Sequence, residues 1–252
     1  MATLSLLFGF LPPRGVWVFV VARLWSSALL KASAIRVKVR YAPGLDPRGS
    51  YLFLPNHQSL FDIPVLFATV PGPVLFLAKR SLFRIPVFGW AMKAGGFIPV
   101  DRKDRSSARG SFQAAVAQLA SGTSVVIFPE GTRSLENELL PFERGGFLLA
   151  LKSGLPLVPV GIRGGLAIQP RGSFAIRPGE VEVVFGEPIR AADFGLRRKG
   201  ELMAEVRRQV GTLAGLHLVG EEGDNGAVKN RAGSAGGESE DGAQVSEPEA
   251  SS

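Results

Sequence analysis

The residues of this sequence best suited to catalysis are His57 and Asp62, in the segment Asn-His-Gln-Ser-Leu-Phe-Asp at positions 56–62. An imidazole beside a carboxylate forms a general base, because the acid fixes the tautomer and stabilises the imidazolium formed when a hydroxyl is deprotonated. The segment follows a predicted strand and precedes a predicted helix, and strand ends are where an α/β sheet presents catalytic side chains. The only other histidine is His217, so imidazole chemistry must use one of these two residues.

The spacing of His57 and Asp62 restricts how the two side chains can meet. On one ideal α-helix they would point roughly 140° apart. The pair therefore requires His57 in a loop and Asp62 at the start of the helix, a start that Pro64 favours because a proline in the first turn loses no hydrogen bond. A structural interpretation stays open, in which Asp62 is an N-cap, or Ser59-x-x-Asp62 a capping box, and His57 a polar loop residue.

Cations follow three further predicted strands. The block at 128–134 (Phe-Pro-Glu-Gly-Thr-Arg-Ser) comes after a buried strand, and its Gly-Thr turn and Arg133 match the geometry of a phosphate. The block at 95–102 ends in Arg102, and Lys79 and Arg80 close another strand. Each block alone could be an ordinary turn with a surface cation. Together they predict a pocket for an anionic substrate.

The periodicity of the apolar residues predicts alternating strands and helices. Residues 35–41 alternate between apolar and basic side chains, as expected of a half-buried strand with one basic face. Further strands are expected at 51–54, 74–77, 97–100, 125–128, 157–162 and 181–185, and helices at 106–121, 146–152 and about 200–216. The expected fold class is α/β, with a mixed, largely parallel sheet flanked by helices over residues 34–218 and a hydrophobic helical pair before it.

The hydrophobic pair is expected in residues 1–33, as two short helices that associate with one membrane face. Two apolar stretches, 4–11 and 16–30, are separated by Pro-Pro-Arg-Gly. A helix over 16–31 would measure roughly 24 Å, short of the roughly 30 Å hydrocarbon core, and Arg23 near its middle disfavours a crossing. Arg14, Arg23 and Lys31 are expected at headgroup level. A pair of core helices is the alternative.

Composition and charge narrow the function classes further. The chain has no cysteine, which excludes disulfides and thiolate chemistry, and two histidines exclude a histidine-rich metal site. Residues 219–252 contain eight acidic and two basic residues and few large apolar ones, so they are expected to form a disordered acidic tail. Residues 1–218 then carry a formal charge of +13, which favours anionic partners such as nucleic acid, acidic lipids or phosphorylated substrates.

The chain resembles the 1-acyl-sn-glycerol-3-phosphate acyltransferases, a family of glycerolipid acyltransferases. His57 and Asp62 fit the family's H-x-x-x-x-D block, residues 128–134 its F-P-E-G-T-R-S block and residues 96–102 its G-x-I-x-V-D-R block. The Leu-Val-Pro-Val run at 157–160 is similar to the fourth block. All four occur in the family's order, and the resemblance covers residues 34–190.

The resemblance implies transfer of an acyl chain from acyl-CoA or acyl-carrier protein to the sn-2 hydroxyl of lysophosphatidate, giving phosphatidic acid. His57 would be the base and Asp62 its orienting partner. Binding of the acceptor is implied for a larger set: Lys79, Arg102, Glu130, Gly131, Thr132 and Arg133. No metal or other cofactor is implied, and the expected place is the cytoplasmic face of a membrane, such as the bacterial inner membrane, with membrane lipids as partners.

Two departures from the family's pattern lie near the expected acceptor site. Members often have Lys-x-Glu-Leu where this chain has Lys79-Arg80-Ser81-Leu82, and Pro-Phe-Lys where it has Pro141-Phe142-Glu143. One change removes a carboxylate and the other replaces a cation with an anion. Both bear on the identity of the acceptor more than on the reaction, so another lysolipid stays open as acceptor.

Two other function classes are weighed against the transferase. A serine hydrolase is disfavoured because the sequence has no Gly-x-Ser-x-Gly elbow. A non-catalytic protein that binds anionic lipid or nucleic acid would suit the basic charge. However, zinc-ligand spacing, an RNP-like aromatic motif and a clear basic recognition helix are all missing from the sequence, so nucleic acid is not expected as a partner.

Overall fold

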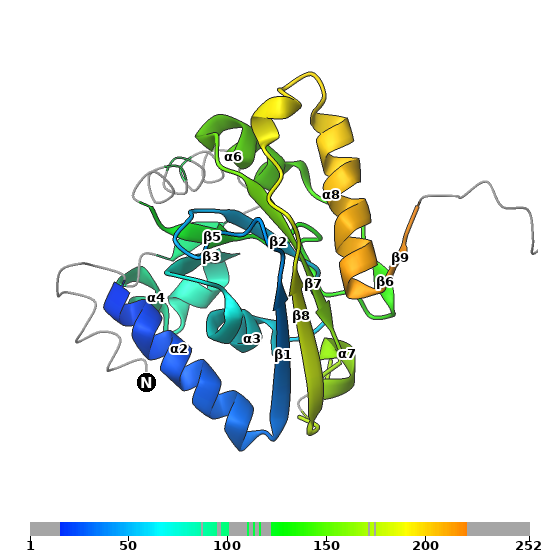
Figure 1. Cartoon of the computed structure of the whole chain (residues 1–252). Helices are drawn as coiled ribbons and strands as arrows, with labels where there is room; N and C mark the ends of the chain where they lie inside the picture. The colour runs from blue at the N-terminus through cyan, green and yellow to red at the C-terminus, as the bar shows by residue number, and fades with distance from the viewer. Residues whose placement is uncertain are drawn as a thin grey trace, which may run out of the picture. The chain divides into compact units, whose positions relative to one another are not determined.

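A seven-stranded sheet runs through the part of the chain that the structure describes (Figure 1). The structure is a computed structural model, and it describes residues 16–220 except 87, 95–96, 101–109, 111–112, 114–115, 117–121, 171 and 174. The sheet order is β1-β8-β7-β2-β5-β3-β4. Its strands are β1 (Ile35–Tyr41), β2 (Leu52–Pro55), β3 (Val74–Lys79), β4 (Ile98–Val100), β5 (Ser124–Val126), β7 (Leu157–Arg163) and β8 (Gly179–Phe185).

The strands that matter for function run in one direction. β7, β2, β5, β3 and β4 are parallel to one another, whereas β8 is antiparallel to β7 and parallel to β1. The carboxyl ends of the five parallel strands therefore meet at one edge of the sheet. The predicted mixed, largely parallel sheet is confirmed, and the predicted catalytic and cationic segments follow strands that end at this edge.

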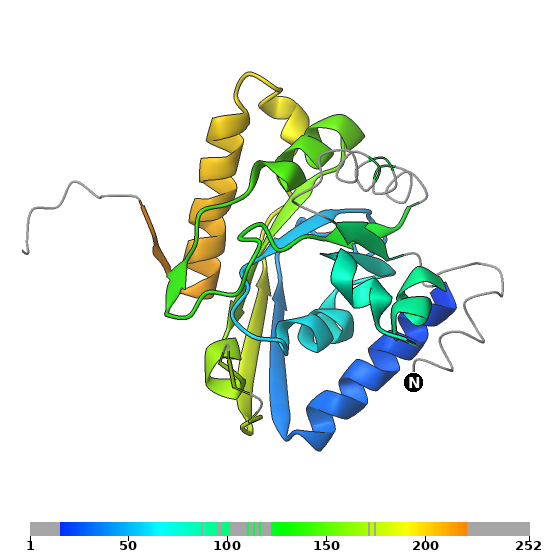
Figure 2. The ribbon, with the colours of Figure 1, turned by 180° about the vertical axis from the view of Figure 1, so that it is seen from behind.

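The central strand β2 is buried on both faces because helices cover the sheet from both sides. Phe53 points into one core with α3 (Asp62–Thr69) and α2 (Val16–Ala32). Leu52 and Leu54 point into the other core with α6 (Arg144–Ser153) and α8 (Lys199–Ala214). All three side chains are fully buried. The two layers of helices are visible from both sides (Figures 1 and 2).

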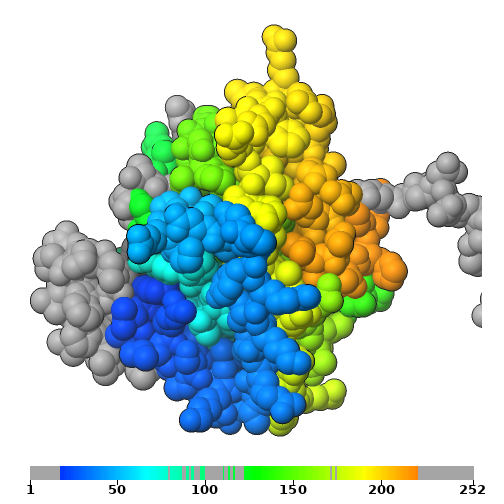
Figure 3. Space-filling model, in the orientation of Figure 1, coloured from blue at the N-terminus to red at the C-terminus, as the bar shows by residue number. Residues whose placement is uncertain are grey.

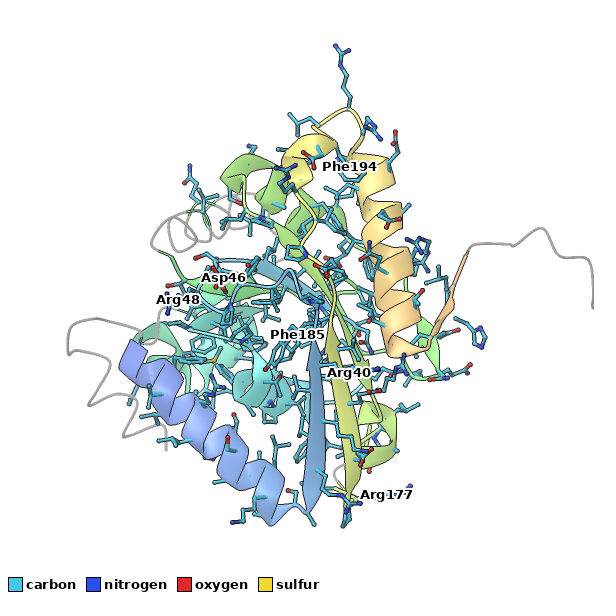
Figure 4. All side chains as sticks on the ribbon, viewed as in Figure 1. Arg40, Asp46, Arg48, Arg177, Phe185 and Phe194 are labelled. Carbon is cyan, nitrogen blue, oxygen red and sulfur yellow. The ribbon has the colours of Figure 1, made fainter. Side chains whose placement is uncertain are left out.

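The outer strand β1 shows the predicted alternation. Its apolar residues Ile35, Val37 and Val39 face the core with α2 and α3. Its basic residues face the other way, where Lys38 pairs with Glu180 and Arg40 with Glu182, both at 2.9 Å. Figure 4 labels Arg40 on this basic face and Phe185 on the apolar one. In the space-filling view, side chains of this blue region project from the surface beside the orange α8 (Figure 3).

The remaining elements are short, and most were not predicted. They are η1 (Arg80–Arg84), α4 (Phe88–Ala94), α7 (Gly165–Ile168), η2 (Ala191–Asp193) and a small parallel pair of β6 (Glu138–Leu139) and β9 (His217–Leu218). The predicted strands and the helices at 146–152 and 200–216 are present, with ends shifted by a few residues. The predicted helix at 106–121 falls largely outside the described residues.

The helix α2 belongs partly to the core, which changes the expectation for the N-terminal segment. Val18, Phe19 and Leu30 are buried, and Ser26 is fully enclosed. Arg23 was expected at headgroup level, but its guanidinium donates to the Val70 carbonyl at 3.4 Å and lies over the Phe19 ring. That cation therefore joins α2 to the end of α3, because the last carbonyls of a helix attract positive charge.

The rest of the expected membrane pair cannot be placed. Its first helix, in residues 1–15, lies outside the described residues, as does the acidic tail beyond residue 220. Within the part that the structure describes, no helix combines the length and the apolar character needed to cross a bilayer.

Gly161 in β7 allows α8 to approach the sheet. A Cβ atom there would lie 2.3 Å from the backbone carbon of Leu213 and 2.5 Å from the nitrogen of Ala214. Backbone atoms cannot move aside as the tip of a side chain can. We predict that Gly161→Ala displaces α8 and lowers the free energy of unfolding by about 1–3 kcal/mol, the usual effect of overpacking.

The matched control is Gly200→Ala, within α8 itself, where an added Cβ meets nothing within 4 Å. That variant should be neutral or slightly stabilising, because alanine has the higher helix propensity. Chemical unfolding monitored by circular dichroism compares the two. Equal stability of both variants would contradict the close approach of α8.

Candidate active site

His57 lies in the loop that leaves β2, and the preceding residue fixes the direction of that loop. Asn56 is buried, and its side chain forms two hydrogen bonds with the backbone of Ile162 in β7. The amide nitrogen donates to the Ile162 carbonyl at 3.0 Å, and the amide oxygen accepts from the Ile162 N–H at 2.7 Å. A side chain thus replaces the sheet pairing that ends at Pro55, and His57 leaves the sheet from a fixed point.

Asp62 holds the histidine and the loop with one oxygen atom. Its Oδ2 is 2.9 Å from His57 Nδ1 and also accepts the backbone N–H groups of Gln58 at 2.8 Å and Ser59 at 2.9 Å. The predicted contact between His57 and Asp62 is therefore present, with His57 in the loop and Asp62 as the first residue of α3. Asp62 is not the N-cap, since that position is Phe61, but it does order the loop before the helix.

The histidine ring is positioned for proton transfer. With Asp62 accepting from Nδ1–H, the lone pair of the neutral imidazole resides on Nε2. The ring stacks on Phe128, with centroids 3.9 Å apart and planes 21° apart. The His57 side chain is 14% exposed to solvent, whereas the Asp62 side chain is 2% exposed. A buried carboxylate behind a partly exposed imidazole is the arrangement of a general base and its orienting acid.

The backbone of His57 is bound on both sides by the segment after β5. Its N–H donates to Glu130 Oε1 at 2.7 Å, and its carbonyl accepts the N–H of Ser134 at 2.9 Å. Gln58 adds a side-chain bond to the Glu136 carbonyl at 2.9 Å. The two predicted chemical blocks, 56–62 and 128–134, are therefore joined through their backbones.

Glu130 is a buried carboxylate that serves two backbone donors. Its Oε1 accepts from His57 and its Oε2 from the Leu140 N–H at 2.9 Å. Burial raises the pKa of Glu130 to about 7, and the nearby Asp62 adds to the rise, while the two backbone N–H groups and Arg207 lower it. Both carboxylate oxygens are thus used inside the protein, although sequence analysis placed Glu130 among the acceptor-binding residues.

Close packing behind Asp62 comes from the end of β7. A Cβ atom on Gly165 would lie 2.7 Å from Asp62 Oδ1, and Gly164 has a φ of 87°. Only glycines fit this turn without displacing the carboxylate or straining the backbone.

The other predicted site residues lie at the same edge of the sheet to the extent that they are described. Lys79 is the last residue of β3, and Gly131, Thr132 and Arg133 follow the turn after β5. Gly131 has a φ of 73° and donates its N–H to the Phe128 carbonyl, Thr132 is exposed, and Arg133 is half-buried. Arg102 follows β4 but falls outside the described residues.

Several residues of the site were not found by sequence reasoning. Asn56, Gly165 and Leu140 carry no chemistry of their own and act through hydrogen bonds or small size. Asn56 could have been suspected, because a buried amide next to His57 needs partners. No local signal points to Leu140, whose contribution is a backbone N–H. Among the described residues, no group of three or more His, Cys, Asp or Glu is placed to hold a metal ion.

Comparison with known proteins shows which family the chain resembles. A family model described as Acyltransferase matches residues 36–163. A chloroplastic 1-acyl-sn-glycerol-3-phosphate acyltransferase from Brassica napus is 39% identical over 139 residues, which cover 55% of this chain and 40% of that protein. A 1-acyl-sn-glycerol-3-phosphate acyltransferase from Escherichia coli K12 is 30% identical over 174 residues, which cover 69% and 70%.

A solved structure extends the likeness to three dimensions. The crystal structure of the 1-acyl-sn-glycerophosphate (LPA) acyltransferase PlsC from Thermotoga maritima superposes with a TM-score of 0.66 at 26% identity, covering 78% of this chain and 80% of that one. The match spans about half the length of several curated plant and algal relatives. The family model covers half of the chain and includes both residues of the His57–Asp62 pair, and on these grounds the chain belongs to the acyltransferase family.

Proposed function

We propose that this protein transfers a fatty acyl chain from a thioester to the sn-2 hydroxyl of 1-acyl-sn-glycerol 3-phosphate, producing phosphatidic acid for phospholipid synthesis. The observation that carries the proposal is the 2.9 Å contact between His57 Nδ1 and the buried Asp62, at the edge where the five parallel strands end. The names of the similar proteins given above support this acceptor. The donor is acyl-CoA or acyl-carrier protein, since both present the same thioester.

His57 acts first as base and then as acid. Its Nε2 takes the proton of the acceptor hydroxyl while the oxygen attacks the thioester carbonyl, forming the new C–O bond. Collapse of the tetrahedral intermediate breaks the C–S bond, and the imidazolium returns the proton to the departing thiolate. Asp62 stabilises the imidazolium between these steps and holds the ring in the tautomer that leaves Nε2 free. A covalent acyl-enzyme is not required.

The acceptor phosphate is bound by cations at the same edge. Arg133 follows the turn after β5, Lys79 ends β3, and Arg102 follows β4 in the sequence. Guanidinium groups bind phosphate through two parallel hydrogen bonds, so the two arginines give both charge and orientation. Gly131 and Thr132 shape the turn that presents Arg133. Glu130 supports this site from behind, because its oxygens are held by backbone N–H groups.

Membrane association is part of the proposal because acceptor and product are lipids. One side of α2 is buried, but the helix also carries three exposed apolar residues, Val20, Leu24 and Trp25. Leu24 is 65% exposed and Trp25 is 41% exposed. Trp90 on α4 is also exposed, and α4 lies beside the N-terminal part of α2 in both ribbon views (Figures 1 and 2). Large apolar side chains exposed together suit insertion into the interface of a bilayer. We infer the cytoplasmic face as the place of action.

Loss of the base or of its orienting acid tests the chemistry. We predict that His57→Ala lowers kcat by about 10⁴-fold because it removes the base, and that Asp62→Asn lowers it by about 10³- to 10⁴-fold because an amide favours the wrong tautomer of the ring. Turnover of labelled acyl-CoA with a panel of lysolipids measures both, and circular dichroism checks folding. His217→Ala, at an exposed position, is the control and should keep full activity.

The same panel separates the candidate functions. Turnover of lysophosphatidate in preference to other lysolipids supports the proposed acceptor, and preference for another lysolipid replaces it. A folded wild-type protein that binds anionic lipid and transfers no acyl chain would be a lipid-binding protein instead.

Replacing the guanidinium of Arg133 tests the binding of phosphate. Arg133→Lys keeps the charge and loses the planar fork, so we predict a KM for lysophosphatidate raised by about 10-fold and a nearly unchanged KM for the acyl donor. Arg198→Lys, an exposed arginine paired with Glu201, is the matched control. A raised KM for the donor alone would assign Arg133 to the donor site.

The exposed side of α2 can be tested without touching its buried side. We predict that the double variant Leu24→Ser, Trp25→Ser weakens binding to vesicles containing phosphatidylglycerol in a flotation assay, because about 25 cal/mol is lost for each Å² of apolar surface no longer inserted. The control is Leu135→Ser, Leu196→Ser, which removes two apolar side chains elsewhere that are at least as exposed, 64% and 65%. Equal weakening in both would contradict a membrane role specific to α2.

A further inference from the structure

Arg207, on α8, binds the segment that holds Glu130. Its Nη2 donates to the Leu139 carbonyl at 2.9 Å and to the carbonyl of Val219, and its Nε donates to the Leu140 carbonyl at 3.3 Å. One guanidinium thereby joins β6 to the residue that follows β9. Figure 1 shows β6 and β9 beside the end of α8.

The residue that Arg207 binds is the one that binds Glu130. Leu140 accepts from Arg207 with its carbonyl and donates its N–H to Glu130 Oε2 at 2.9 Å. Glu130 Oε1 accepts the N–H of His57 at 2.7 Å. A continuous series of hydrogen bonds therefore runs from α8 through Leu140 and Glu130 to the backbone of His57.

We propose that Arg207 is a positioning residue for His57, acting through Leu140 and Glu130 to keep the Glu130 carboxylate ionised and bound to the His57 N–H. This inference rests on the proposed function for its catalytic consequence, but the contact with His57 can be measured without substrate. The role differs from that of the neighbouring Arg208, which is exposed and pairs with Glu205 at 2.8 Å within its own helix.

Both hydrogen bonds of Glu130 are strongest in the ionised form, because the hydroxyl oxygen of a protonated carboxyl is a weaker acceptor for an N–H donor. Burial and the charge of Asp62 oppose ionisation, and Arg207 is the charged side chain that favours it. Within the described residues, the charges that act on the pKa of Glu130 are those of Asp62 at the start of α3 and Arg207 on α8, and His57 contacts Glu130 through its backbone N–H. Removal of Arg207 must raise the pKa of Glu130, so that its protonated form persists to higher pH.

The direct test uses the fact that the chain has two histidines. The full-length protein labelled with ¹⁵N-histidine gives two backbone amide signals, and His217→Gln assigns them. The His57 amide proton should show an inflection near pH 7, where Glu130 titrates. The imidazole signals recorded in the same samples report the titration of the ring itself, so that this titration can be distinguished from that of Glu130. Glu130→Gln should abolish the inflection at the amide.

The variant Arg207→Gln should move this inflection upward by about half a pH unit or more, as expected when an adjacent cation is removed. Arg208→Gln, on the same helix, should leave it in place. The proposal is overturned if the two variants give the same inflection, or if the inflection persists in Glu130→Gln. Neither result depends on acyl transfer, so failure of the proposed function and failure of this inference are distinguishable.

The pH profile of turnover provides the catalytic readout. Arg207→Gln should lower kcat by about 10- to 100-fold at pH 7, a usual effect of misplacing a catalytic group, and recover part of it at higher pH, where Glu130 ionises again. A loss of equal size at every pH would show a merely structural role and overturn the proposal.

A second variant keeps the test decisive if Arg207→Gln does not fold. Arg207→Lys retains the positive charge and loses the planar guanidinium. The value of kcat should therefore fall, while the pH at which activity declines on the acidic side of the profile should not shift. Combined with Glu130→Gln, Arg207→Lys should cost little more than Glu130→Gln alone, because both act on the same contact. Multiplicative losses in the double variant would contradict the route through Glu130.

Discussion

The site depends on one oxygen atom, Oδ2 of Asp62, which accepts three hydrogen bonds. The imidazole of His57 and the backbone N–H groups of Gln58 and Ser59 all converge on it. Five residues of continuous helix would separate the two side chains by roughly 140°, so the chain must turn between them. The carboxylate proposed to orient the base also stabilises this turn, because it accepts hydrogen bonds from buried backbone N–H groups. Catalytic geometry and loop structure are therefore a single constraint.

The sheet fixes the position of this loop relative to the neighbouring strands. β2 lies between β7 and β5, so the loop carrying His57 emerges with one neighbour on each side. Asn56 binds the β7 side through Ile162, and Glu130 and Ser134 bind the β5 side. A histidine held from both neighbouring strands has little freedom to move, which is the requirement for proton transfer over hydrogen-bond distances. The parallel direction of the strands places Lys79 and the turn that carries Arg133 along the same edge.

The sequence predicts the local part of this arrangement well. Alternation in 35–41 and the start of α3 at Asp62 follow from periodicity and from Pro64, because these signals concern neighbouring residues. Contacts between distant residues leave no such trace: Asn56 meets Ile162 across 106 positions and Arg207 meets Leu139 across 68. For α2 the apolar pattern is ambiguous in principle, since a helix that is buried on one side and apolar on the other satisfies both the core and the membrane interpretations. The burial of Phe19 and Leu30 and the contact of Arg23 with Val70 show the side of α2 that faces the core.

Glu130 shows why the type of a motif residue is an incomplete guide to its role. A carboxylate in a block proposed to bind a phosphate would repel the ligand if its charge faced it. Here both oxygens point to backbone donors and the residue is 5% exposed, so the negative charge is directed toward His57 and Leu140. Arg133 lies three residues later, after a turn that the Gly131 N–H closes by donating to the Phe128 carbonyl. The acidic member of the block thus binds the protein's own backbone, whereas the basic member is the one proposed to bind the ligand, and residue types alone do not separate these two roles.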